Sequence, residues 1–309
     1  MSRGKLGYTF LIGILTIALT VLFIISFRQE GDGTLIAPVL KSGKSLGINL
    51  WFPQNTLGVQ INAPQITAKA AFLVDTKTGQ VLYDKNAHEK LPIASLVKVM
   101  TALIALEHKS LDDQYVVSQR AADMEPDKML LIPGERLTLK ELLYGIFLIS
   151  ANDAAEVLAQ GTTGDLKEFI KLMNDKTLQL GMKNTHIVNP TGLDEDGQNS
   201  YSTAYDMAIL ARYAIRNYPV LVEISKTEHI FIEGTPQHQD YDMYSGINLI
   251  TTYPGVLGFK TGYTPEAGLV LITLARKNGQ EVLGVILGSE NRRDEARELL
   301  DYSFKKLGS

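Results

Sequence analysis

The chain contains no cysteine among its 309 residues. This absence excludes disulfide bonds, zinc sites with thiolate ligands and a cysteine nucleophile. Histidine is also scarce: the five histidines are scattered, and none is spaced from another as metal-binding pairs are. We therefore expect no metal ion and no cofactor, and no histidine stands in an evident catalytic context.

Runs of basic residues are also missing. Lys and Arg number 30 against 34 Asp and Glu, which gives a net charge of -4, and the longest basic runs are pairs such as Arg292-Arg293. Proteins that bind nucleic acids usually carry a basic patch, so nucleic acid is not an expected partner. The 45% hydrophobic content fits a folded globular protein, and the length fits one large domain or two small ones.

Charge is absent from Leu6 to Phe27, a run of about 22 residues and long enough to cross a bilayer as a helix. A cleaved signal peptide would have a shorter apolar run and an Ala-x-Ala site. Arg3 and Lys5 precede the run and favour an inside N-terminus. We expect a single-pass anchor in the cell membrane with the rest of the chain outside the cytoplasm.

The expected organisation is an anchor at 1–27, a linker at 28–66 and one folded domain at 67–309. Hydrophobic periodicity places strands at both ends of this domain and helices between them, so one sheet should collect strands from both ends. The expected elements are strands 70–75 and 80–84, helices 95–108, 138–150, 152–160, 165–181 and 203–216, a hairpin at 268–288 that turns at Asn278-Gly279, and a last helix at 294–306.

Two polar residues, Ser95 and Lys98, interrupt the apolar run IASLVKVM. A spacing of three places both side chains on one helix face. A buried lysine loses hydration, which lowers its pKa and favours the neutral amine. A neutral amine can accept the proton of a neighbouring serine, so this pair predicts a serine nucleophile that needs no histidine. In the first helical turn, free N–H groups would stabilise developing negative charge.

The pair is a weak signal by itself, because Ser-x-x-Lys occurs three times in the chain. Only the copy at Ser95 is embedded in an apolar helix. Two further motifs follow it in order: Ser150-Ala151-Asn152, between two helical stretches, and Lys260-Thr261-Gly262, before the last strands. The three together are the motif set of class A β-lactamases and penicillin-binding proteins.

In this context residues 65–309 closely resemble the low-molecular-mass penicillin-binding proteins, the serine-type D-alanyl-D-alanine carboxypeptidases of peptidase family S11. The resemblance implies a β-lactamase-like α/β (α+β) fold, with an antiparallel sheet flanked by helices, a helical subdomain and the site in the cleft between them. The strings that carry it include PIASLVKVMTALIALE, LTLKELLYGIFLISANDAAEVLA, STAYDMAILARYAI and YPGVLGFKTGYTPEAG.

The resemblance also implies roles for single residues. Ser95 corresponds to the acylated nucleophile, Lys98 to its general base and Ser150 to a serine that shuttles protons near the lysine. The implied substrate contacts are Asn152 for the peptide group, Lys260, Thr261 and Arg292 (or its neighbour Arg293) for the terminal carboxylate, Gly262 for room beside the strand, and the N–H of Tyr263, with that of Ser95, for the oxyanion.

The implied function is removal of the terminal D-alanine from peptidoglycan stem pentapeptides through an acyl-enzyme on Ser95, with β-lactams as acylating inhibitors. A peptidoglycan DD-endopeptidase is the closest alternative. A class A β-lactamase would need a Glu-x-x-Leu-Asn signature, which is missing between Asn152 and Lys260. A non-enzymatic β-lactam sensor is the remaining alternative, and retention of all the polar motif residues argues against it.

Overall fold

The computed structural model describes residues 51–54, 62–194 and 197–308. All of them belong to one compact unit, Asn49–Ser309. The anchor expected at 1–27 and most of the linker lie outside the described residues. Within the described ranges, no helix is long and apolar enough to cross a membrane.

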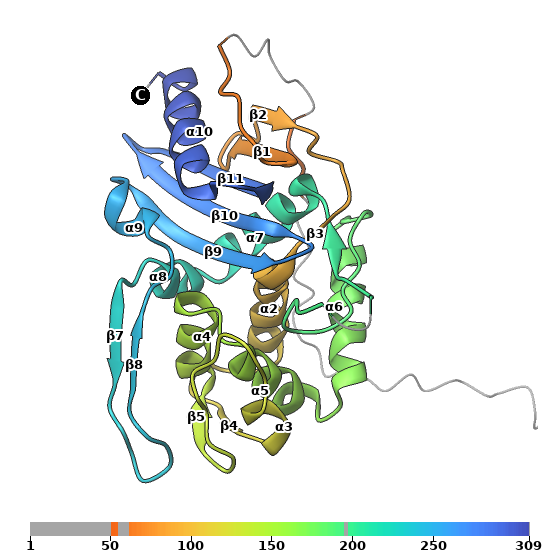
Figure 1. Cartoon of the computed structure of the whole chain (residues 1–309), viewed down its shortest axis with the longest axis vertical. Helices are drawn as coiled ribbons and strands as arrows, with labels where there is room; N and C mark the ends of the chain where they lie inside the picture. Colours follow the sequence, from red (N-terminus) through yellow and green to blue (C-terminus); the bar gives the residue numbers. More distant parts are fainter. Residues whose placement is uncertain (1–50, 55–61, 195–196, 309) are drawn as a thin grey trace, which may run out of the picture. The chain divides into compact units, whose positions relative to one another are not determined.

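A five-stranded antiparallel sheet forms one layer of the fold, in the order β2-β1-β11-β10-β9 (Figure 1). Its first two strands come from the beginning of the folded part and its last three from the end, as the sequence predicts. The bounds are Ala70–Asp75 for β1, Val81–Lys85 for β2, Val256–Thr264 for β9, Gly268–Lys277 for β10 and Gln280–Ser289 for β11.

The predicted β10–β11 hairpin is confirmed, and its turn has a clear cause. Asn278 and Gly279 both have positive φ angles, 49° and 77°. Two-residue hairpin turns of this kind match the twist of the strands, and asparagine and glycine adopt these angles at little cost. The turn thereby aligns two ten-residue strands at the centre of the sheet.

Helices cover both faces of the sheet. On one face, α10 (Arg292–Lys306) buries Leu299, Leu300 and Phe304 in a cluster with the sheet residues Leu73 and Leu271. The opposite face is covered by α7 (Ala204–Asn217), which contacts β1 and β11. Strand β9 is the edge strand beside the helical part of the molecule, which lies below the sheet in Figure 1.

The helical part surrounds α2 (Lys98–His108), whose first eight residues are all buried. Because α2 is apolar on every side, it can be packed only as a central helix. Helices α4, α5 and α6 enclose it. The remaining elements are β3 (Leu91–Pro92), β4 (Gln114–Val116), α3 (Gln119–Ala122), β5 (Arg136–Thr138), α4 (Leu139–Leu148), α5 (Asn152–Thr163), α6 (Leu166–Gln179), β6 (Tyr201–Ser202), α8 (Val220–Ser225), β7 (His229–Ile232), β8 (Tyr241–Tyr244) and α9 (Leu249–Thr252).

Several short elements differ from the predictions or were not predicted. The helix expected from Ser95 begins instead with a 3-10 turn, η1 (Ala94–Val97), and continues as α2 from Lys98. Ala94 has φ of +45°, which a regular helix excludes. The β7–β8 hairpin was not predicted, because its short strands are separated by eight mainly polar residues.

Candidate active site

Lys98 stands at the centre of the site. Its ammonium nitrogen lies 2.8 Å from Ser95 Oγ, 2.7 Å from Asn152 Oδ1 and 2.7 Å from the carbonyl oxygen of Thr191. The whole side chain is buried, whereas Ser95 is half-buried. The structure therefore brings together the two residues that the sequence paired, at hydrogen-bonding distance.

The partners of Lys98 suit a neutral amine. An amide oxygen and a carbonyl oxygen can only accept, so Asn152 and Thr191 take two N–H groups. The third direction faces Ser95 Oγ, where a neutral amine presents its lone pair to the hydroxyl hydrogen. Burial lowers the pKa of Lys98 from its ordinary value of 10.5 to about 7, although Asp127 and Asp153 oppose the shift. A substantial fraction of Lys98 is then uncharged near neutral pH.

Asn152 is held in one orientation by the protein. Its Nδ2 group donates to the carbonyl oxygen of Pro126 at 2.5 Å, and its backbone N–H donates to that of Asp127 at 2.7 Å. Because an amide has one donor end and one acceptor end, the Pro126 contact turns Oδ1 towards Lys98. Asn152 thus connects the base to the loop that begins at Pro126.

A turn at residues 189–192 supplies the third partner of Lys98 and lies outside the helices and strands that the sequence predicts. Asn189 Oδ1 accepts the N–H of Gly192 at 2.7 Å, which closes the turn. Gly192 has φ of +80°, and a Cβ atom there would lie 2.0 Å from Ala94 O. Only glycine therefore allows this turn to pack against the peptide group that precedes Ser95.

Lys260 is a second buried lysine close to Lys98. Its ammonium nitrogen donates to Ser150 Oγ at 2.9 Å and to the Thr261 carbonyl oxygen at 2.6 Å. Burial, with Lys98 and Arg292 nearby, holds the pKa of Lys260 well below its ordinary value. Ser150 itself has φ of +62° at the junction of α4 and α5. Its hydroxyl bonds to Lys260 in this structure, so its expected role near Lys98 stays a prediction.

Gly262 lies on β9 directly against the nucleophile turn. A Cβ atom at Gly262 would be 2.9 Å from the backbone nitrogen of Ser95 and 3.3 Å from Ala94 Cβ. The side of Gly262 that lacks a Cβ faces η1, and its expected role of leaving room for substrate stays a prediction. Its absent side chain lets β9 approach Ser95. The next residue, Tyr263, is exposed on the edge strand.

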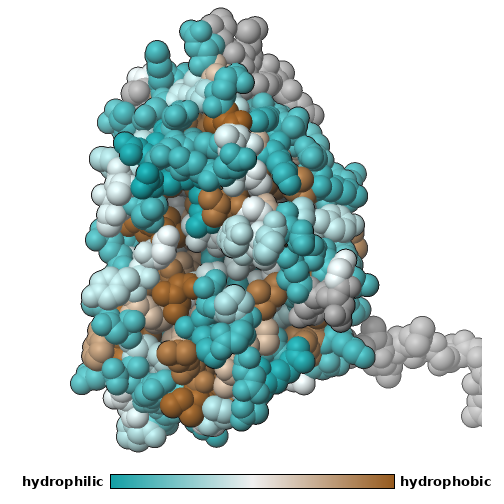
Figure 2. Space-filling model, viewed as in Figure 1, coloured by the Kyte–Doolittle hydropathy of each residue, from teal (hydrophilic) through white to brown (hydrophobic). Residues whose placement is uncertain are grey.

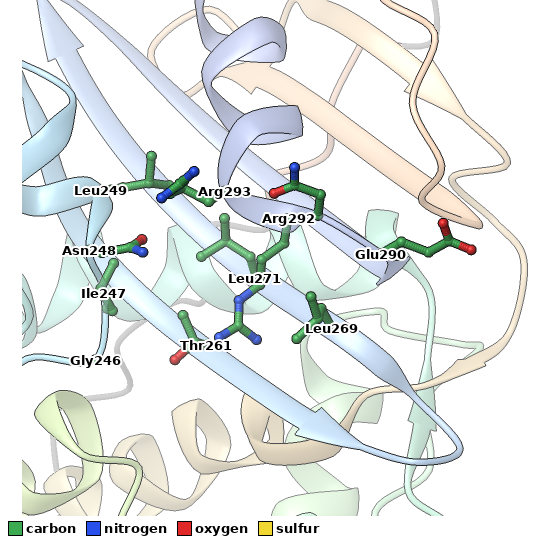
Figure 3. A pocket seen from close by; sticks show the side chains of 11 residues that line it. Gly246, Ile247, Asn248, Leu249, Thr261, Leu269, Leu271, Glu290, Arg292 and Arg293 are labelled. Carbon is green, nitrogen blue, oxygen red and sulfur yellow. The ribbon is translucent and has the colours of Figure 1, made fainter.

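Thr261 and Arg292 share a pocket of about 260 Å³ on the α10 face of β9. Figure 3 shows the Arg292 side chain pointing towards Thr261 and the Arg293 side chain pointing towards Leu249. Arg292 Nη1 donates to the carbonyl oxygens of Gly262 and Val270, which fixes the guanidinium beside the strand. Arg293 instead pairs with the adjacent Asp294. Of the two neighbouring arginines, Arg292 is the one at the site.

Asp153 is a buried acid that the sequence analysis did not single out. Its carboxylate accepts the N–H groups of Met129 at 3.0 Å, Leu131 at 3.2 Å and Ala154 at 2.8 Å. Burial raises its pKa, although these hydrogen bonds oppose the rise. Together with Asn152, it fastens loop 126–131 to the first turn of α5. In the sequence, only its position directly after the Ser-x-Asn motif could have indicated that Asp153 belongs to the site.

Comparison with known proteins agrees with this geometry. Residues 58–291 match the profile of the peptidase S11 family, described as D-alanyl-D-alanine carboxypeptidase. The chain belongs to this family. Among curated relatives, the D-alanyl-D-alanine carboxypeptidase DacF of Bacillus subtilis is 38% identical over 247 residues, which cover 77% of this chain and 62% of DacF. DacB2 of Mycobacterium tuberculosis is 31% identical over 78% of this chain and 84% of its own length.

Solved structures of S11 relatives share the fold. The DD-transpeptidase of Streptomyces K15 superposes with a TM-score of 0.74 at 29% identity, over 79% of this chain and all of that one. A D-alanyl-D-alanine carboxypeptidase of Mycobacterium tuberculosis superposes with a TM-score of 0.73 at 30% identity, over 82% of this chain and 96% of that one. The chain spans about three fifths of the length of DacF and of the Escherichia coli relatives DacA and DacC. The α/β fold with its antiparallel sheet and flanking helices is thus that of the DD-peptidases.

Proposed function

We propose that this protein is a serine-type D-alanyl-D-alanine carboxypeptidase that removes the terminal D-alanine of peptidoglycan stem peptides. The observation that supports this most directly is the environment of Lys98: a buried amine with two acceptor-only partners and Ser95 Oγ in its third direction. Family membership supports the same activity.

Ser95 attacks the carbonyl carbon of the penultimate D-alanine while Lys98 accepts the hydroxyl proton. The oxyanion is stabilised by the N–H groups of Ser95 and Tyr263, since donors of this kind contribute about 2.7–4 kcal/mol each in comparable sites. The proton then passes, with Ser150 as relay, to the amine of the departing D-alanine. Water hydrolyses the acyl-enzyme, with Lys98 again acting as base.

The positive groups beside β9 bind the substrate's terminal carboxylate. Lys260 and Arg292 supply charge and Thr261 a hydroxyl group, a combination that suits an anion. The second hydrogen of Asn152 Nδ2 is available to the substrate's peptide carbonyl, because the first is used by Pro126. β-Lactams carry a carboxylate and a reactive carbonyl, so they should acylate Ser95 as inhibitors.

The test is incubation of the purified chain with a pentapeptide ending in D-Ala-D-Ala, followed by mass spectrometry. We expect a tetrapeptide and free D-alanine, and loss of both products and of penicillin labelling in Ser95→Ala. Ser303→Ala is the matched control, because Ser303 begins another Ser-x-x-Lys and its buried hydroxyl has no hydrogen-bond partner among the residues described. Persistent labelling of Ser95→Ala would reject the assignment.

We also propose that residues 6–27 anchor the protein in the cell membrane, with the catalytic domain outside the cytoplasm. The support is the uncharged run itself. In fractionated cells the full chain should sediment with membranes and be released by detergent but not by high salt. Recovery in the soluble fraction would contradict the proposal.

A further inference from the structure

A hollow of about 520 Å³ lies at one end of the sheet, between the β1–β2 turn, the β10–β11 turn and the end of α7. Gln280 lines this hollow, and its side chain donates to the carbonyl oxygen of Leu307 at 2.6 Å, which joins the hollow to the end of α10. Figure 2 shows mainly hydrophilic side chains over α10, whereas the hydrophobic side chains of this face lie over the region of α4 and β5. A partner of this end of the sheet would therefore be recognised by charge.

The two acidic residues that line the hollow are already bonded within the protein. Glu281 is buried, and its carboxylate pairs with Arg276 at 2.6 Å and with Arg216 at 3.2 Å. Asp75 is also buried, and its carboxylate accepts the backbone N–H of Lys77 at 2.7 Å. Neither acid is therefore left to bind a ligand.

The basic side chains of the hollow face outward. Those of Arg216 and Arg276 are 46% and 58% exposed, and each guanidinium uses only Nη2 for its bonds among the residues described. Lys77 is exposed, and its amine has no hydrogen bond or ion pair in the same part of the chain. Guanidinium groups bind phosphate through two parallel N–H bonds, so the free donors suit phosphate groups.

Positive charge continues beyond the hollow. Lys277 directly follows Arg276 and is exposed, and Lys305 and Lys306 belong to the last turn of α10, next to the Gln280 contact. These groups give one end of the sheet a positive surface in a protein whose net charge is -4. Such a local surplus attracts anionic partners over a distance of about 8 Å at physiological salt.

The first described residues of the chain, 51–54, pack at this same end of the sheet. The guanidinium carbon of Arg212 lies 4.3 Å from the centre of the Trp51 ring. Gln54 Nε2 donates to the carbonyl oxygen of Thr78, a residue of the hollow, at 3.0 Å. Between these two contacts, Phe52 is 46% exposed. Aromatic side chains beside basic ones are typical of surfaces that contact lipid headgroups.

The length of the preceding chain limits how far this end can lie from a membrane. The run proposed as the anchor ends at Phe27, and residues 28–50 separate it from Trp51. A fully extended chain of that length spans at most about 80 Å. Lipid headgroups are then always within reach, so a weak attraction is enough to bring the domain to them.

We propose that this end of the sheet docks on the phosphate groups of anionic membrane lipids through Lys77, Arg216 and Arg276. This inference rests on the proposed membrane anchor and goes beyond it, since an anchor alone leaves the orientation of the domain free. Each basic residue near an anionic membrane surface strengthens binding about fivefold, and salt screens the attraction. Docking is therefore reversible and depends on the lipid.

Docking at this end keeps the active site away from the lipid. Gly262, whose backbone lies against Ser95, pairs with Val270 of β10, and Lys277 at the other end of β10 is seven residues further along. Seven residues of an antiparallel strand span about 24 Å. Ser95 is then held up to about that distance from the headgroups, within reach of peptides of the cell wall.

The test places the full-length chain in vesicles of phosphatidylcholine, alone or mixed with phosphatidylglycerol. Trp51 is the only tryptophan of the chain and lies at the proposed contact, so energy transfer from it to a dansyl-labelled headgroup reports docking. Transfer should be greater in the anionic vesicles and should fall to the phosphatidylcholine level in high salt. Equal transfer in the two kinds of vesicle, as a soluble phosphate ligand would give, overturns the proposal. An increase that salt does not reverse overturns it as well.

Lys77→Gln removes one positive charge without removing a hydrogen bond of the side chain. At the salt concentration where half of the wild type is docked, its ratio of docked to undocked chain should be about fivefold lower. Lys140→Gln is the matched control, because Lys140 is exposed at the start of α4 and its amine has no partner among the residues described. Equal effects of the two variants would mean that only net charge matters, and would reject the site.

Failure of the proposed anchor would look different, because the wild type would then not float with phosphatidylcholine vesicles at all. In that case flotation with the anionic vesicles decides. Flotation of the wild type that is weakened in Lys77→Gln but not in Lys140→Gln supports docking, and absence of flotation rejects it. None of these measurements uses the peptidase activity, and cleavage of the soluble pentapeptide should be the same in Lys77→Gln as in the wild type.

Discussion

Replacement of Asn152 by aspartate tests the reasoning about Lys98 most directly. The change places a carboxylate oxygen where Oδ1 now lies, 2.7 Å from the Lys98 nitrogen. At an effective dielectric constant of about 20, two unit charges at that distance attract by on the order of 6 kcal/mol. This energy corresponds to roughly four pKa units. Burial lowers the pKa of Lys98 from 10.5 to about 7, so the new charge is sufficient to reverse the shift.

The consequence for catalysis is a change in pH dependence. With a pKa of about 7, about half of Lys98 is neutral at pH 7. With its ordinary value restored, roughly one molecule in 3,000 would have a neutral base at that pH. Acylation of Asn152→Asp at pH 7 should therefore be about 10³-fold slower than in the wild type, and should recover about tenfold with each pH unit.

The assay is stopped-flow acylation by a chromogenic β-lactam between pH 5.5 and 9.5. Asn152→Ala is the matched control, because it loses the same amide contact with substrate but adds no charge. In Asn152→Ala the maximal acylation rate at high pH should fall. The pH at which the rate reaches half of this maximum should stay near 7. If the acylation rates of the two variants rise with pH over the same range, the new carboxylate has not changed the protonation of the catalytic base. Lys98 is then not the group that titrates.

Two further predictions concern stability. Lys98→Met should change the Tm more favourably at pH 6.5 than at pH 9.5. A lysine whose folded-state pKa is depressed destabilises the fold wherever the unfolded chain is protonated, and that cost is complete below pH 7 and disappears between about pH 7 and 10.5. The loss of the hydrogen bonds to Asn152 and Thr191 is the same at both pH values, so the difference in Tm, measured by calorimetry, isolates the charge. Gly192→Ala should lower the free energy of unfolding by several kcal/mol, since it combines positive φ with a contact of 2.0 Å to Ala94 O. Denaturant titration measures the free energy of unfolding. A decrease of less than about 1 kcal/mol would mean that the turn rearranges to accommodate the added methyl group.

The sequence predicted those parts of the site that depend on local spacing. Ser95 and Lys98 are three residues apart, so any helical backbone brings their side chains to one face. The prediction held although η1 is a 3-10 turn, because residues three apart also align in that geometry. The β10–β11 turn was predictable for a similar reason, since Asn278-Gly279 carries its conformational preference in itself.

The partners of Lys98 could not be predicted in this way. Thr191 lies 93 residues further along the chain, in a turn whose composition shows only that it is a turn. The position of Asn152 follows from its bonds to Pro126 and Asp127, and the loop depends on Asp153. These relations exist only after α2, α5 and the loops have packed, so no local pattern encodes them.

The two buried lysines differ in what surrounds them, and the difference assigns their roles. Among the residues described, Lys98 bonds only to neutral oxygens and to no carboxylate, so its environment favours the uncharged form that a base requires. Lys260 bonds to Ser150 Oγ and a carbonyl oxygen, but its neighbours Thr261 and Arg292 border a pocket open to solvent. A substrate carboxylate beside Lys260 would favour its charged form. A charged Lys98 lowers the pKa of Lys260, and a charged Lys260 would by the same repulsion oppose protonation of Lys98.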